Sequence, residues 1–155
     1  MLLFLDIDGV MVPAKSWKIP EILNDGFPAF DIKAVRVLQK LISEDTTVIL
    51  TTSHKLRYTI EQWKEIFHKR GLHLSRLESL DDNIHCKSRK DEVMNWFNFN
   101  DVTEEFIIID DDKSLNDLPP YLKNRLILTS SLIGLTDNHF EEIETILSLK
   151  QQTVK

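Results

Sequence analysis

The chain has 155 residues, of which 42% are hydrophobic and 28% charged, so it can bury the core of one globular domain and is not disordered. Its 25 acidic residues outnumber its 19 Lys and Arg residues, and the net charge of −6 disfavours long-range attraction to nucleic acid. The single cysteine, Cys86, excludes an internal disulfide, and no segment has the apolar length of a membrane span. We therefore expect a cytoplasmic protein with no membrane partner.

Short apolar runs alternate with amphipathic segments along the chain. The runs typical of buried strands are LLFL at 2–5, TVIL at 47–50, FIII at 106–109 and RLILT at 125–129, with a further strand expected around 72–77. Apolar residues three and four positions apart predict helices over 32–42, 56–71, 91–97 and 137–149. This alternation predicts an α/β fold, a three-layer Rossmann-like domain with a mainly parallel central sheet.

One domain over residues 1–150 accounts for this pattern, and residues 151–155 are expected to form a frayed C-terminal tail. Residues 11–30 have no clean period and predict an irregular loop or hairpin beside the first strand. We leave open whether this segment closes over a site, and whether Trp17 within it contacts a ligand.

Four polar clusters follow the predicted strands or begin a helix. They are Asp6 with Asp8; Thr51, Thr52 and Ser53; Lys87, Arg89 and Lys90; and Asp110, Asp111 and Asp112. Because parallel strands end at one edge of their sheet, the first, second and fourth clusters can converge there. Carboxylates gathered in this way repel one another and require a cation or a shifted protonation state. Oxygen ligands beside a phosphate favour Mg²⁺.

This arrangement contains the parts of a phosphoryl-transfer site. Asp6 can act as a nucleophile that carries the phosphoryl group, and Asp8 as general acid and base, with its backbone carbonyl facing the metal. The Thr52 hydroxyl and the neighbouring backbone amides, with Ser53 in the same cluster, would hold the transferring oxygens, although a one-residue change of register would favour Thr51 instead. A cation from Lys87, Arg89 or Lys90 would balance the developing charge.

Each cluster also has a structural reading when taken alone. DxDG is often a turn, Thr51 to Ser53 a loop or helix cap, SRKDEV the start of a solvated helix, and Asp110 to Asp112 a capped loop. Their order along the chain favours the functional reading, because all four fall where one mechanism needs them. His54, Lys55 and Arg57 follow the second cluster and either line the site or begin a helix. The other histidines lack zinc-ligand spacing.

Three of these motifs resemble those of the haloacid dehalogenase (HAD) superfamily of phosphohydrolases. LFLDIDGV is similar to its first motif, ILTTSH to its second and FIIIDDD to its fourth, while KSRKDEVMNWF, FIIIDDDKSL and SSLIGLT resemble the HAD domain of Swiss Army Knife RNA repair proteins. The resemblance implies a HAD-type fold in which Asp6 is nucleophile and metal ligand, Asp8 acid and base, Thr52 a phosphate ligand, and Asp110 with Asp111 metal ligands. Arg89 aligns with a motif that normally holds lysine, with Lys87 and Lys90 nearby.

The lengths between the motifs leave no room for a large cap domain. The resemblance therefore implies a capless Mg²⁺-dependent phosphomonoesterase that forms an aspartyl phosphate. Its expected partner is a phosphorylated small molecule or macromolecular end, and its oligomeric state is left open. The alternatives are a nucleic-acid end phosphatase of the RNA-repair kind, which the net charge disfavours, and a non-catalytic binding or regulatory module, which the arginine in the third motif favours.

Overall fold

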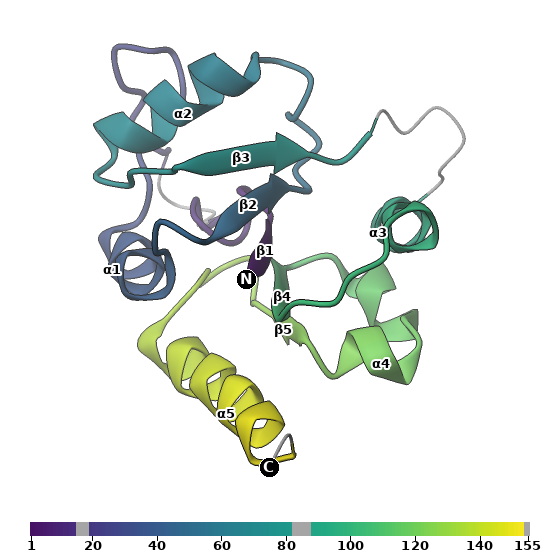
Figure 1. The fold of residues 1–155 in the computed structure, drawn as a ribbon. Helices are drawn as coiled ribbons and strands as arrows, with labels where there is room; N and C mark the ends of the chain where they lie inside the picture. Colours follow the sequence, from purple (N-terminus) through teal and green to yellow (C-terminus); the bar gives the residue numbers. More distant parts are fainter. Residues whose placement is uncertain (15–18, 82–87, 154–155) are drawn as a thin grey trace.

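The computed structural model describes residues 1–14, 19–81 and 88–153, which form five parallel strands and the helices packed on them (Figure 1). The strands are β1 (Leu2–Leu5), β2 (Thr47–Leu50), β3 (Arg76–Ser79), β4 (Phe106–Asp110) and β5 (Leu126–Leu128). The helices are α1 (Ile32–Leu41), α2 (Ile60–Lys69), α3 (Arg89–Phe99), the 3₁₀ helix η1 (Lys113–Asp117), α4 (Pro120–Lys123) and α5 (Asp137–Thr153). The strand order β3-β2-β1-β4-β5 places β1 at the centre of the sheet.

Two apolar layers enclose this sheet. Alternate residues of a strand point to opposite faces, so Leu3 and Leu5 of β1 pack in one buried cluster and Leu2 and Phe4 in the other. The first cluster includes residues of α1, α2 and α5, and the second includes Val93 of α3 and Leu122 of α4. The two groups of helices lie on opposite sides of the strands in Figure 1. The predicted three-layer Rossmann-like fold is therefore confirmed, and the described residues contain no large cap domain.

The local predictions hold except near the ends of some elements. The helix expected from residue 56 begins at Ile60, because Thr59 accepts a hydrogen bond from the amide of Gln62 while the Gln62 side chain accepts one from the amide of Thr59. The strand expected around 72–77 lies at Arg76–Ser79, where it pairs with β2. Pro120 occupies the first turn of α4, a position that needs no amide donor.

Among the described helices, none combines the length and the apolar character needed to cross a membrane.

The register of the central strands determines which polar side chains meet. Leu5 pairs with Leu50 of β2 and with Ile109 of β4. The residues that follow, Asp6, Thr51 and Asp110, therefore lie side by side on three neighbouring strands. By the alternation of side chains, all three face the layer that contains α3.

The segment after β1 is tied to α2 by a buried arginine. Arg70 donates to both carboxylate oxygens of Asp25, at 2.7 and 3.0 Å, and to the carbonyl oxygens of Phe27 and Pro28, both at 2.9 Å. Ile22 and Pro28 form an antiparallel bridge around Gly26, so this part of the predicted loop is a small hairpin. Trp17 lies outside the described residues. The hydrogen bonds from Arg70 lower the pKa of Asp25 to about 2.

We predict that this pair makes stability depend on acid pH. Because the pKa of Asp25 lies below its ordinary value of 3.8, the pair stabilises the fold above about pH 4, and that contribution is lost as the pH falls toward 2. Asp25→Asn should lower the free energy of unfolding by about 2 kcal/mol at pH 6 and by much less at pH 2. Urea unfolding across this range measures the difference, with exposed Asp45→Asn as the control. A difference independent of pH would contradict the prediction.

Candidate active site

Three carboxylates meet at the carboxyl edge of the sheet. Asp6 follows β1, Asp110 ends β4 and Asp111 comes next along the chain; each offers an oxygen atom, and these oxygens all lie within 4.8 Å of one another. Asp6 is 3% exposed and Asp110 is fully buried. Asp110 Oδ1 accepts the amides of Asp111 and Asp112, at 2.8 and 3.1 Å, which orients its carboxylate. The convergence predicted for these strand ends is present.

One guanidinium group faces this cluster from the first turn of α3. Arg89 Nη1 donates to Asp110 Oδ2 at 2.6 Å and to Thr51 Oγ1 at 3.2 Å, and it lies 3.4 Å from Asp6 Oδ1. Ser88 caps the helix by accepting the amide of Asp91, so the turn that carries Arg89 is regular. Arg89 thus lies at the carboxylate cluster, and its role as the cation of the third motif stays a prediction.

The three carboxylates carry more charge than Arg89 can balance. Burial is the main cause that raises the pKa of Asp6 to about 9, and the negative charge of Asp110 adds to it while Arg89 opposes it. Burial and Asp110 also raise the pKa of Asp111, against a hydrogen bond with Asp6 that lowers it. Burial alone would lower the pKa of Arg89, but Asp110 and Asp6 outweigh it and the pKa is raised. Without a bound cation, these raised pKa values favour a protonated carboxyl in the cluster.

Asp8 lies outside the carboxylate cluster. Its side chain is 58% exposed, and its Oδ2 lies 2.8 Å from His54 Nε2. The amide of His54 donates to Thr52 Oγ1, and its ring meets the Phe27 ring edge to face with the centroids 6.0 Å apart. A histidine from the loop after β2 therefore holds the second aspartate of the DxD motif toward solvent, where it can exchange protons.

The two threonines of the second motif have different partners. The Thr51 hydroxyl donates to Asp110 Oδ2 at 3.0 Å and is fully buried beside Arg89. The Thr52 hydroxyl accepts the amide of His54 at 3.2 Å, and Ser53 is exposed. The structure thus brings Thr51 into the carboxylate cluster, while the phosphate-binding role of Thr52 and Ser53 stays a prediction. Strand alternation was the signal for Thr51, because it shares a face with Asp6.

Among the described candidates for the third motif, Arg89 pairs with the carboxylates and Lys90 forms no ion pair with them. Lys90 directs its backbone amide to Ser114 Oγ at 3.1 Å, and this contact joins α3 to η1. Lys87 lies outside the described residues. Lys55, by contrast, is 6% exposed and forms an ion pair with Glu92 of α3, at 2.8 Å between Nζ and Oε2. The sequence left open whether Lys55 lines the site or is an exposed residue at the start of a helix, and it did not identify this partner.

The donor set of the cluster fits a magnesium ion. Mg²⁺ takes oxygen ligands at about 2.1 Å, so two ligands of one ion lie at most about 4.2 Å apart. The spacing of at most 4.8 Å within the cluster needs only a small closure to reach this geometry. Because Asp6 and Asp110 are buried, a divalent cation would replace the proton that their mutual repulsion now requires. Asp6, Asp110 and Asp111 would hold such an ion through side-chain oxygens.

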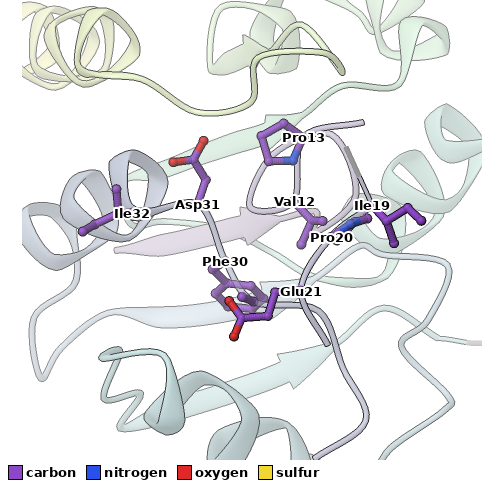
Figure 2. Close-up of a pocket in the computed structure, with 9 residues that line it drawn as sticks. Val12, Pro13, Ile19, Pro20, Glu21, Phe30, Asp31 and Ile32 are labelled. Carbon is purple, nitrogen blue, oxygen red and sulfur yellow. The ribbon is translucent and has the colours of Figure 1, made fainter. Parts of the chain in front are cut away.

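A cavity of about 370 Å³ lies along the segment that follows β1 (Figure 2). Val12 and Pro13 line it together with residues 19–21 and 29–32, and its charged lining residues are Glu21 and Asp31. The Asp31 side chain accepts the amide of Lys33 as the cap of α1. Because none of the clustered carboxylates lines this cavity, the chemistry of the site is placed at the sheet edge and not inside it.

Comparison with known proteins yields a family for this chain. Residues 2–140 match the family model described as the HAD domain in Swiss Army Knife RNA repair proteins. No curated protein and no solved structure matches the chain. The matched region contains all five strands and every residue of the carboxylate cluster.

We predict that the absence of a side chain at Gly9 is needed for the position of the Asp111 carboxylate in the cluster. It has a φ of +79°, and a Cβ added there would overlap the Asp111 carboxylate, whereas Gly26 has the same φ and nothing within 4 Å. Alanine at either position should cost about 1–2 kcal/mol from backbone strain. Only Gly9→Ala should also displace Asp111 and reduce the rise in melting temperature that we expect from added Mg²⁺. Thermal unfolding with and without Mg²⁺ tests this, and an equal Mg²⁺ response in both variants would contradict it.

Proposed function

The chain belongs to the family of HAD domains found in Swiss Army Knife RNA repair proteins, and on that premise we propose that it is a Mg²⁺-dependent phosphohydrolase acting through an aspartyl phosphate. The observation that carries the proposal is the meeting of Asp6, Asp110 and Asp111 with Arg89 at one edge of the sheet. Stability alone does not account for it, since burying like charges costs free energy.

Asp6 is the proposed nucleophile. Its carboxylate attacks the phosphorus of a phosphomonoester, a bond forms between Asp6 and phosphorus, and the bond to the ester oxygen breaks. Asp6 must be ionised for this step, and burial opposes ionisation. Mg²⁺, when bound, would offset the negative charge of the carboxylates and of the phosphate. Arg89 would hold the transferring oxygens, with Thr51 beside it.

Asp8 is the proposed acid and base. In its protonated form it donates to the leaving oxygen, and as a carboxylate it then removes a proton from the water that attacks phosphorus. That second step frees Asp6 and inorganic phosphate. The exposure of Asp8 and its contact with His54 support this role, because a group that exchanges protons in both steps needs access to solvent.

We predict that Asp6→Asn abolishes Mg²⁺-dependent hydrolysis of p-nitrophenyl phosphate, because an amide is a much weaker nucleophile than a carboxylate. The expected loss of kcat is at least about 1,000-fold. Asp117→Asn, the same change at an exposed position in η1, should leave kcat unchanged. Initial rates with and without Mg²⁺ measure both variants.

The same samples test the alternative of a binding module. Mg²⁺ that raises the melting temperature of the wild type, with no turnover on a broad panel of phosphate esters, would overturn the enzymatic proposal and support a module that binds without reacting. Turnover that survives in Asp6→Asn would overturn the role of Asp6.

A nucleic-acid end is the second candidate substrate. It is supported by the description of the matched family and by exposed or half-buried cations near the carboxyl edge of an acidic chain, namely Arg57 after β2, Lys90 in α3 and Lys113 after β4. We predict faster release of phosphate from 5′- or 3′-phosphorylated oligonucleotides than from mononucleotides, with a rate that falls as salt is raised. Equal or faster rates on mononucleotides and sugar phosphates would exclude this candidate.

A further inference from the structure

A buried ion pair links the loop after β2 to α3. Lys55 Nζ lies 2.8 Å from Glu92 Oε2, and the two side chains are 5% and 7% exposed. A pair buried to this extent gains little net stability over apolar residues of the same size, because both ions lose their hydration. A contribution to stability therefore does not by itself account for the burial of this ion pair.

The Lys55 end of the pair is held by the layer that contains α2. The amide of Lys55 donates to the carbonyl of Thr52 at 3.1 Å, and the carbonyl of Lys55 accepts Trp63 Nε1 at 3.1 Å. Trp63 is fully buried in the first apolar cluster. The ammonium group thus extends from a rigid backbone between the second motif and the core.

The Glu92 end belongs to the helical turn that carries Arg89. The two residues are three positions apart, so their side chains lie on neighbouring parts of one helix face. The amide of Glu92 donates to the carbonyl of Ser88, which closes this turn. The negative charge of Glu92 also favours the charged form of Arg89.

The position of α3 depends on such contacts. Val93 packs under the sheet and the amide of Lys90 bonds to Ser114, but apolar packing tolerates small sliding. A directed contact between Lys55 and Glu92 limits that sliding at the first turn.

We propose that Lys55 and Glu92 are positioning residues, which hold the first turn of α3 so that Arg89 reaches Asp6 and Asp110. This inference rests on the proposed phosphohydrolase function. Arg89 Nη1 lies 2.6 Å from Asp110 and 3.4 Å from Asp6, and a displacement of about 1 Å would break the first contact.

Glu92→Gln tests the proposal, because glutamine has nearly the same shape and lacks the charge. We expect kcat on p-nitrophenyl phosphate to fall roughly 10-fold with little change in KM. In an Arg89→Lys background, the same change should alter kcat less than about 2-fold, since the group on which it acts has gone. The melting temperature should fall in both backgrounds. Glu105→Gln, which removes the ion pair with Arg125 at the opposite edge of the sheet, should leave kcat unchanged.

A purely structural pair would behave differently. In that case Glu92→Gln lowers the melting temperature while kcat of the folded protein stays at the wild-type value, or kcat falls by the same factor in both backgrounds; either result overturns the proposal. If Glu92→Gln does not fold, Lys55→Met with Glu92→Met removes both charges and tests the same expectation for kcat. A wild-type kcat in that folded double variant would also overturn it.

A second readout is independent of turnover. The side-chain Nε–H resonance of Arg89, assigned by its absence in Arg89→Lys, should be sharp in the wild type and broadened or lost in Glu92→Gln. If the wild type hydrolyses no phosphate ester, the proposed function fails, yet this resonance still reports whether the pair orders Arg89. An unchanged resonance in Glu92→Gln would overturn the positioning role alone.

Discussion

Repulsion between buried carboxylates is the constraint around which this molecule is organised. The pairing of Leu5 with Ile109 in neighbouring parallel strands makes Asp6 and Asp110 adjacent. Two carboxylates about 4 Å apart repel by roughly 4 kcal/mol at an effective dielectric constant of 20. Arg89 offsets part of this negative charge. The raised pKa of Asp6 favours its protonated form, which lowers the charge of the cluster further. A divalent cation can replace that proton, so the repulsion that destabilises the cluster is also the feature that would favour binding of a metal.

How far the site could be predicted depends on whether its signals are local. Asp6 and Asp110 each follow an apolar run, and parallel strands end at one edge, so their meeting was predictable from sequence. The contact of Arg89 with these carboxylates was not predictable, because it depends on the rotation of α3 about its axis. That rotation is set by tertiary contacts of Glu92 and Val93 with residues far away in sequence. A helical pattern alone contains no such information.

The same distinction accounts for smaller differences between prediction and structure. Alternation along β2 assigns Thr51 to the face of Asp6, but the assignment requires knowing the residue at which the strand ends, and an error of one residue exchanges Thr51 with Thr52. The late start of α2 follows from reciprocal hydrogen bonds between Thr59 and Gln62, which compete with the hydrophobic period before them. The core pattern was therefore informative about which elements form, and the capping side chains about where they begin.

The different surroundings of Asp6 and Asp8 follow from the short stretch of backbone between them. Asp6 continues the line of β1 into the buried layer under α3, whereas the chain turns at Gly9, whose φ of +79° suits a residue without a side chain. That turn directs Asp8 to solvent, where His54 contacts it. Two side chains of the same type thereby enter different environments, one buried among carboxylates and the other open to water, as their proposed roles require. The glycine also leaves room for Asp111 beside Asp6, so one residue without a Cβ serves both the separation of the two aspartates and the assembly of the cluster.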